Sequence, residues 1–285
     1  MRILILGTTG MLGNTLFRYL SADHENVVFG TIRRAQPPIV FSAIATNQQV
    51  IASILVEDEQ ALKSAFSISR PDVIINCIGV VKQLTSAEDP LISIPINALL
   101  PHRLARLATM HDARLVHIST DCVFSGNRGN YRESDIPDAT DLYGRSKLLG
   151  ELYSPHTVTL RTSIIGHELT TKHGLLEWFL SQGDSVSGYS HAIFSGLPTV
   201  ELARVIKEHV IPNKSLAGLY HVATAPISKL ELLRLIANIY GKSIKIVPSD
   251  KVAIDRSLDA ARFDSATGYS APGWPVLIEH MHNFR

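Results

Sequence analysis

The N-terminal stretch constrains the fold more than any other part of the chain. A continuous apolar run, residues 3–6, leads directly into Gly7-Thr-Thr-Gly-Met-Leu-Gly13, and apolar residues then recur at helical spacing up to Leu20. This pattern predicts a buried strand, a glycine turn and a helix. Glycines at such a turn let the backbone approach a pyrophosphate, which then faces the amides of the helix N-terminus. The stretch therefore favours dinucleotide binding over the simpler alternative, a strand-helix turn without a ligand. The residues expected to contact the dinucleotide here are Gly7, Thr9, Gly10, Met11, Leu12 and Gly13.

Two arginines follow the second predicted strand, residues 27–31. An NAD-binding site usually offers an acidic residue near this point, about 20 residues beyond the glycines, to hold the ribose 2′-hydroxyl. This chain offers Arg33 and Arg34 instead. Because a guanidinium pairs well with a 2′-phosphate, we expect NADPH rather than NADH. The competing explanation is that the two arginines only keep a strand end solvated.

Apolar runs and helical patterns continue to alternate through the first half of the chain. This rhythm predicts an α/β fold with a Rossmann-type doubly wound parallel sheet, whose ligands lie at the carboxyl ends of the strands. We expect the fourth strand, residues 73–79, to end beneath the cofactor, with contacts from Cys77, Ile78 and Gly79. Residues 35–50 look like a loop or insertion whose role cannot be read. The other predicted strands are residues 51–56, 115–118 and 157–164, and the predicted helices include one from Asn97 to Met110.

The alternation changes character beyond residue 165. Residues 175–180 and 199–210 read as short amphipathic helices, and Ser228 is placed to cap a third. With short strands around Ile193, Tyr220 and Ile246, these helices are expected to form a smaller C-terminal α/β substrate lobe. The predicted division is therefore a cofactor-binding domain, residues 1–165, and a substrate-binding lobe, residues 166–285, which could be interleaved with the first domain.

A tyrosine and a lysine stand four residues apart in Asp141-Leu-Tyr-Gly-Arg-Ser-Lys-Leu-Leu-Gly-Glu151. On a helix this spacing puts Tyr143 and Lys147 on one face. A phenol has a pKa of about 10, so it serves as an acid or base near neutrality only if a neighbouring cation stabilises its phenolate. Lys147 is placed to lower that pKa, although one such pair is expected by chance on a surface helix.

The composition excludes several other classes of protein. With 27 basic and 26 acidic side chains the net charge is +1, which gives no sign of a nucleic-acid or membrane partner. Cys77 and Cys122 lack C-x-x-C spacing, so we expect buried free thiols and a reducing compartment. No apolar run is long enough to span a bilayer, and the strand at residues 2–7 leaves no room for a signal peptide, so a cytoplasmic location is expected. The 12 histidines show no metal-ligand spacing.

Together the motifs resemble the extended short-chain dehydrogenase/reductase family. The glycine turn, the strand-end Ser-Thr-Asp at residues 119–121 and the Tyr-x-x-x-Lys stand in the family's order and approximate spacing. The segments HISTDCVFSGNRGNYRESD and DLYGRSKLLGE are most similar to the dTDP-4-dehydrorhamnose reductase branch, and LRTSIIG and GLYHVA also fit. The resemblance implies that Thr120, Tyr143 and Lys147 are the catalytic trio, that Gly7, Gly10 and Gly13 line the pyrophosphate, and that Asn97 is the family's cofactor-side asparagine. Ser119 could share the role of Thr120.

The resemblance also implies an activity, the NADPH-dependent reduction of the 4-keto group of a nucleotide-linked deoxysugar for surface polysaccharide synthesis. Related dehydratases place Asp-Glu after the threonine, whereas this chain has Asp121-Cys122, which suits simple carbonyl reduction. Candidate contacts to the nucleotide-sugar substrate are Lys82, Val123 and Arg256, although the two charged residues could be ordinary solvated side chains. Two alternatives stay open: a sugar-nucleotide epimerase, and a non-catalytic NADP-binding regulatory protein. A homodimer is compatible with the resemblance.

Overall fold

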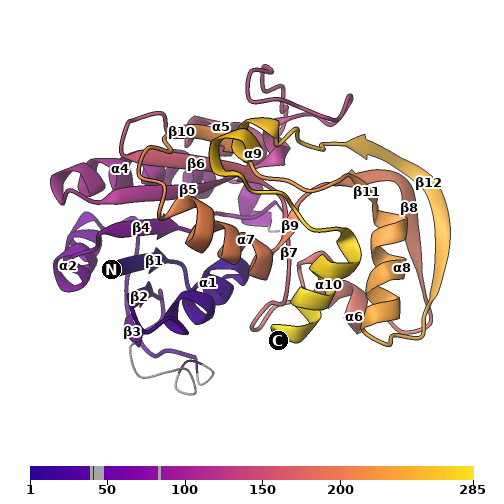
Figure 1. Ribbon diagram of the computed structural model, residues 1–285, viewed down its shortest axis with the longest axis horizontal. Coiled ribbons are helices and arrows are strands. Elements are labelled where there is room, and N and C mark those ends of the chain that lie inside the picture. The colour runs from indigo at the N-terminus through magenta and orange to yellow at the C-terminus, as the bar shows by residue number, and fades with distance from the viewer. Residues whose placement is uncertain (39–40, 42–47, 83–84) are drawn as a thin grey trace.

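The computed structural model describes residues 1–38, 41, 48–82 and 85–285 (Figure 1). Over these residues the main sheet has seven strands, all parallel, in the order β10-β6-β5-β4-β1-β2-β3. The predicted Rossmann-type α/β fold is therefore confirmed. The strands are β1 Arg2–Leu6, β2 Val27–Thr31, β3 Gln48–Ile51, β4 Val73–Asn76, β5 Arg114–Thr120, β6 Thr157–Thr162 and β10 Gly218–His221.

Helices cover both faces of this sheet because its strands are apolar on both sides. In β1, Ile3 and Ile5 belong to one core cluster and Leu4 and Leu6 to another, as the period-2 geometry of a strand requires. The first face packs against α1 (Met11–Ser21) and α7 (Thr199–Val205), which touch each other. The second face packs against α2 (Glu59–Ser69) and α4 (Leu100–Met110).

The strand order reverses beside β1. The chain runs from β1 to one edge through β2 and β3, and then returns to build the other half from β4 onward. In doubly wound sheets the ligand crevice lies at this switch point, at the carboxyl ends of the strands. The glycine turn follows β1, and Cys77 follows β4, so the two segments expected to hold the cofactor meet at this point.

A second, three-stranded sheet lies at one end of the molecule (Figure 1). Its long strands β8 (Ser185–Phe194) and β12 (Lys245–Asp255) pair in parallel, and the short β11 (Ile227–Ser228) pairs with β8. Ser228 caps the following helix by accepting a hydrogen bond from the amide of Glu231, as predicted. The helices of this part are α6 (Leu175–Ser181), α8 (Lys229–Ile239) and α10 (Trp274–Asn283); α9 (Ala261–Thr267) lies against β10.

Two elements expected in the smaller lobe belong to the main sheet layer instead. The strand around Tyr220 is β10, which pairs with β6 at the sheet edge. The helix predicted over residues 199–210 is α7 with its continuation Ile206–Val210, and it packs on α1. Side-chain periodicity does not say which sheet an element joins, so the sequence could not decide whether these two elements belong to the main sheet layer or to the smaller lobe. The division at residue 165 stays a prediction.

Several predicted strand boundaries were wrong. The fifth strand was expected over residues 115–118 but spans Arg114–Thr120, and the sixth was expected over residues 157–164 but ends at Thr162. The third strand was expected over residues 51–56 but ends at Ile51, because Ser53 has a positive φ of 60° that interrupts extended backbone. The fourth strand ends at Asn76, whose side-chain oxygen accepts a hydrogen bond from the amide of Ile78 and turns the chain. Of the expected loop at residues 35–50, residues 48–50 form the start of β3, and residues 39–40 and 42–47 lie outside the described part of the chain.

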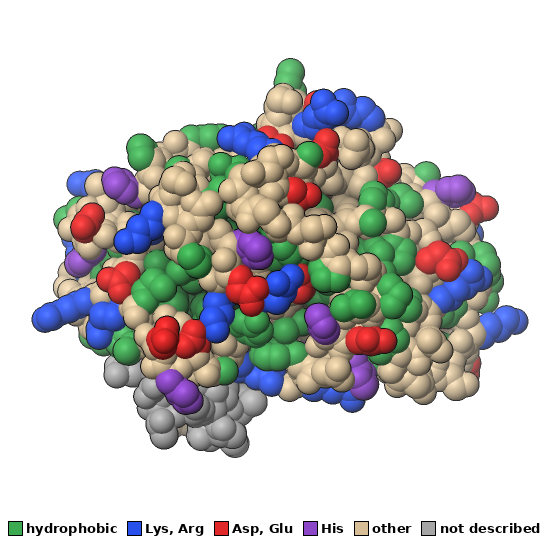
Figure 2. Space-filling model, viewed as in Figure 1, with side chains coloured by type: hydrophobic (Ala, Val, Ile, Leu, Met, Phe, Trp, Pro, Cys, Tyr) green, Lys and Arg blue, Asp and Glu red, His purple; other side chains and the backbone are tan. Residues whose placement is uncertain are grey.

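The surface carries both signs of charge. Figure 2 shows Lys, Arg, Asp and Glu side chains interspersed over the visible face, in keeping with the net charge of +1. No helix in the described residues is long and apolar enough to cross a membrane.

Candidate active site

The glycine turn after β1 is built for close backbone contact. Gly7 has a φ of 85°, a left-handed conformation that favours glycine. A Cβ on Gly13 would lie 2.1 Å from the carbonyl oxygen of Gly7, so no larger residue fits there without a backbone shift. Gly10 begins helix α1 without a side-chain cap, which leaves its first amides free of side-chain acceptors. These features fit a bound pyrophosphate.

The other residues of the turn differ in what they can offer a ligand. The side chain of Thr9 is exposed, and that of Met11 is half-buried. Leu12 was expected to contact the cofactor, but its side chain is buried in the core against the sheet. Only the backbone amide of Leu12 is therefore available to a cofactor, because helical periodicity turns its side chain inward.

Arg33 and Arg34 are exposed just beyond the end of β2. The carbonyl of Thr31 accepts hydrogen bonds from the amide of Thr8, at 3.1 Å, and from its hydroxyl, at 3.0 Å. These bonds hold the end of β2 beside the glycine turn. The arginines are thus placed at the same sheet edge as the turn, where a cofactor ribose is expected.

The segment after β4 lies between the glycine turn and the helix that carries Lys147. Ile78 crowds Gly7, since a Cβ on Gly7 would lie 2.8 Å from the Ile78 side chain. A Cβ on Gly79 would lie 3.9 Å from the Nζ of Lys147. Cys77, at the start of the segment, is partly exposed, and burial raises the pKa of its thiol to about 12. The sequence therefore correctly predicted a free thiol here.

The side chain of Asn97 forms three hydrogen bonds within the protein. Its side-chain oxygen accepts from the amide of Val80 at 2.9 Å, and its side-chain nitrogen donates to the Val80 carbonyl and to the hydroxyl of Ser146, each at 3.2 Å. The residue is almost fully buried. It therefore fastens the segment after β4 to helix α5 (Leu142–Leu149), and its predicted cofactor contact remains a prediction.

Thr120, Tyr143 and Lys147 come together from β5 and α5. The Thr120 hydroxyl donates to the carboxylate of Asp121 at 3.2 Å, and its side chain lies close enough to the phenol of Tyr143 to lower the pKa of that phenol. Lys147 is buried, and its Nζ donates to the carbonyl of Ile118 at 2.7 Å. The strand end that carries Thr120 therefore contacts both functional side chains of α5.

Sequence reasoning did not single out Gly144, which lets α5 approach the end of β5. A Cβ on Gly144 would lie 2.3 Å from the carbonyl oxygen of Cys122. Its amide donates to the carboxylate of Asp141, the N-cap of α5, at 2.7 Å. The Tyr-Gly dipeptide inside a predicted helix was the available signal, because glycine is unfavourable there without a packing reason.

Burial controls the charge states of the pair on α5. It raises the pKa of Tyr143, and the nearby Cys122 and Asp121 add to that effect, while the hydrogen bond from Thr120 opposes it. It also lowers the pKa of Lys147 to about 8. The sequence predicted that Lys147 would lower the pKa of Tyr143; in the structure burial raises that pKa instead. The phenol is consequently protonated near neutral pH and suited to donate a proton.

Two of the three predicted substrate residues lie beside this trio. Lys82 forms an ion pair with Asp141 at 2.7 Å, and the Nε of Arg256 donates to the carbonyl of Phe124 at 2.7 Å. Both cations lower the pKa of Cys122, although burial dominates and raises it to about 12. Val123 was expected at the substrate, but its side chain is completely buried in a small apolar cluster. That side chain cannot contact a ligand.

Ser119 does not share the role of Thr120. Its hydroxyl donates to the buried carboxylate of Glu151 at 2.7 Å. Neighbouring residues of a strand point to opposite faces, so Ser119 faces away from Thr120. The alternation of side chains along a strand was the sequence signal that could have distinguished Ser119 from Thr120.

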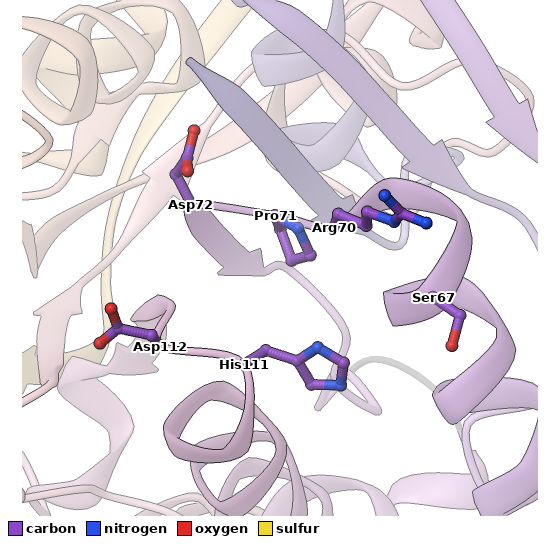
Figure 3. A pocket seen from close by; sticks show the side chains of 6 residues that line it. All are labelled: Ser67, Arg70, Pro71, Asp72, His111 and Asp112. Carbon is purple, nitrogen blue, oxygen red and sulfur yellow. The ribbon is translucent and has the colours of Figure 1, made fainter.

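A cavity of about 530 Å³ lies elsewhere, at the amino ends of β4 and β5 (Figure 3). Its walls come from the end of α2, the loop into β4 and the turn between α4 and β5: Ser67, Arg70, Pro71, Asp72, His111 and Asp112. Thr120 ends β5, so the cavity is at the opposite end of the strands from the trio. Among the described residues, no three His, Cys, Asp or Glu side chains come together as a metal site.

A family model described as the RmlD substrate binding domain matches residues 1–262. The chain belongs to the RmlD family. The match confirms the resemblance to extended short-chain dehydrogenase/reductases, which rested on three separated motifs.

Similar solved structures share this fold along the whole chain. The hypothetical dTDP-4-dehydrorhamnose reductase from Sulfolobus tokodaii is 28% identical, with a TM-score of 0.77 over 96% of this chain and 98% of that chain. The dTDP-4-dehydrorhamnose reductase of Bacillus anthracis, solved in complex with NADP, is 21% identical, with a TM-score of 0.76 over 99% of this chain and 98% of that chain.

Two relatives found by sequence similarity have different names. Methionine adenosyltransferase 2 subunit beta from Xenopus laevis is 30% identical over 150 residues, which cover 53% of this chain and 41% of that protein. The match thus spans less than half the length of that relative. The probable low-salt glycan biosynthesis reductase Agl14 from Haloferax volcanii is 24% identical over 94% of this chain and 93% of that protein.

Proposed function

We propose that this RmlD-family protein is an NADPH-dependent reductase of the 4-keto group of a nucleotide-linked 6-deoxysugar. The observation that carries the proposal is the convergence of Thr120, Tyr143 and Lys147 at the carboxyl edge of the sheet, next to the glycine turn. The reductase names of the relatives that match along the whole chain support the same activity. The glycan relative supports a role in surface polysaccharide synthesis, and the free thiols favour the reducing cytoplasm.

The chain's own residues account for the proton chemistry of such a reduction. NADPH, bound at the glycine turn, would supply the hydride. Tyr143, whose pKa burial raises, holds a proton at its phenolic oxygen and donates it to the developing alkoxide. Thr120 hydrogen-bonds the same oxygen and stabilises charge as it appears in the transition state. The ammonium of Lys147 supplies the positive charge that makes proton release from the phenol easier.

Lys82 and Arg256 lie on the substrate side in this proposal. Both are close enough to Cys122 to act on its charge state, so a nucleotide diphosphate entering beside Tyr143 would meet two cations. Asp121-Cys122 offers no carboxylate where a dehydratase has its glutamate, and the thiol, with its pKa near 12, is no substitute base. The site therefore suits reduction without elimination of water.

The direct test is NADPH oxidation by the purified protein against a panel of dTDP-, UDP- and GDP-linked 4-keto-6-deoxysugars. We expect turnover with one nucleotide class and a product reduced at C4. Absence of NADPH consumption with every member of the panel would refute the reductase assignment.

Two other functions make different predictions in the same assay. A sugar-nucleotide epimerase would retain NAD through purification and interconvert sugars with no net NADPH consumption. A regulatory NADP-binding subunit, the reading favoured by the methionine adenosyltransferase 2 subunit beta match, would bind NADP and a partner protein without turnover. The complete Thr120, Tyr143 and Lys147 set argues for the enzyme, because a pure binder has no need of a proton donor.

Cofactor preference should depend on Arg33 and Arg34. Replacing both with alanine removes the charge-assisted partners of a 2′-phosphate, together worth ~1.5–3 kcal/mol, so we expect the KM for NADPH to rise ~10- to 100-fold. The KM for NADH should stay nearly constant. Steady-state kinetics with both cofactors measures the effect, and a double alanine variant of Arg103 and Arg106 on α4 is the control. An equal loss with both cofactors would contradict the assigned role.

A further inference from the structure

A buried polar ladder crosses three neighbouring strands directly beneath helix α5. Ser119 on β5 pairs in register with Arg161 on β6, which pairs in register with His221 on β10. In-register neighbours point to the same face of a sheet, so the three side chains form one row. All three, with the carboxylate of Glu151 above them, are at most 4% exposed.

The carboxylate of Glu151 accepts hydrogen bonds from two members of this row. It receives hydrogen bonds from the Ser119 hydroxyl and from the Nε and Nη2 of Arg161, each at 2.7 Å. Glu151 follows the last turn of α5, so these bonds tie the end of that helix to the strand that carries Thr120. Buried charges of this kind cost stability unless they are fully paired, and these are.

Arg161 is itself held in one orientation. Its guanidinium lies over the ring of Phe124, 5.2 Å from the centroid, and its Nη1 donates to the Nε2 of His221 at 3.3 Å. The Nδ1 of His221 lies 3.0 Å from the carbonyl of Tyr131, so that nitrogen carries the proton. Burial lowers the pKa of His221 to about 4, which keeps the ring neutral and able to accept from Arg161.

Lys147 stands one helical turn before Glu151. The titratable groups that face it are Tyr143 on its own helix, Glu151, Cys77 from the segment after β4, and His117 from β5. Burial raises the pKa of Cys77 to about 12 and lowers the pKa of His117 well below its usual value, so both are neutral near pH 8. Of these groups, Glu151 carries the negative charge that opposes loss of the Lys147 proton.

We propose that Glu151, clamped by Ser119 and Arg161, is a positioning residue that keeps Lys147 cationic and holds α5 against the strand end bearing Thr120. The proposal rests on the proposed reductase function for its catalytic meaning, since only a charged Lys147 assists proton release from Tyr143. Ser119 and Arg161 act through Glu151, with whose carboxylate their side chains form hydrogen bonds. Burial alone would discharge the lysine.

The test is direct titration of Lys147 by NMR of protein labelled with [ε-¹³C]lysine, with the signal assigned from a Lys147→Arg variant. Wild-type Lys147 should titrate near pH 8, the value to which burial lowers its pKa. In Glu151→Gln we expect the midpoint to fall by ~1 pH unit, because an opposing charge has been removed. Glu151→Asp should restore the wild-type midpoint. The alkaline limb of kcat/KM should shift with it, lowering activity at alkaline pH by up to ~10-fold relative to pH 6.5.

Glu201→Gln is the matched control. Glu201 is equally buried and is paired with Arg204 at 2.6 Å, but it lies on α7 and receives the hydroxyl of Tyr269. Its loss should lower stability without moving the Lys147 titration. If Glu151→Gln folds and Lys147 titrates as in wild type, the proposal is wrong.

A folding failure is also informative. The double variant Glu151→Gln/Arg161→Gln leaves no lone buried charge. Because it removes a cation together with the anion, the acid shift of Lys147 should be smaller than in Glu151→Gln but in the same direction, since Glu151 is the partner that acts on Lys147. If both variants fail to fold while Glu201→Gln folds, Glu151 is purely structural and the proposal is overturned. Because the titration needs no substrate, it decides this proposal even if no 4-ketosugar is reduced, a result that would count against the reductase function alone.

Discussion

Replacing Tyr143 with phenylalanine is expected to lower kcat by ~10²- to 10⁴-fold, the usual contribution of a positioned general acid. The change removes one oxygen atom and keeps the aromatic ring. The dissociation constant for NADPH should change little, because the glycine turn and the arginines are untouched. Single-turnover reduction and NADPH fluorescence titration measure the two quantities separately.

Tyr19→Phe provides a matched control for this experiment. Tyr19 lies near the carboxyl end of α1, beside Phe284 and Lys207, and burial raises the pKa of its phenol as well. It is remote from the glycine turn at the other end of the same helix. Near wild-type turnover of Tyr143→Phe would exclude the proton-transfer role and bring the regulatory alternative forward.

Replacing Gly13 with alanine is expected to weaken NADPH binding by ~10- to 100-fold and to destabilise the fold by ~1–3 kcal/mol. The added Cβ would lie 2.1 Å from the Gly7 carbonyl oxygen and 2.8 Å from the Gly7 carbonyl carbon. Both are backbone atoms, so the clash can be relieved only by moving the turn away from the helix. NADPH fluorescence titration and thermal unfolding report the two effects.

Gly183→Ala controls for the loss of a glycine. No atom lies within 4 Å of the position of its added Cβ, and its backbone is not left-handed. Its NADPH affinity and unfolding temperature should equal those of the wild type. Unchanged affinity in Gly13→Ala would show that the close approach of turn and helix is not what prepares the cofactor site.

The proximity of Tyr143 and Lys147 was predictable because both residues lie on one helix. Tyr143 and Lys147 need only an α-helix to share a face, and α5 supplies it. Val123 and Leu12 show the limit of motif reasoning. Each stands inside a functional motif, yet its side chain packs into a core cluster, and burial of that kind depends on partners distant in the sequence.

The amino-acid sequence by itself determined the local elements and the chemistry available to them: a buried strand before a glycine turn, a helix that carries Tyr143 and Lys147 on one face, and a βαβ rhythm that admits few topologies. These follow from periodicity, glycine conformations and capping, which act over a few residues. Tertiary structure alone decided that β10 joins the main sheet, that Ser119 serves Glu151, and that burial sets the pKa values of Tyr143 and Lys147. The physical reason is that pairing, desolvation and ion-pair partners depend on segments far apart in the chain, which become neighbours only when the sheet assembles.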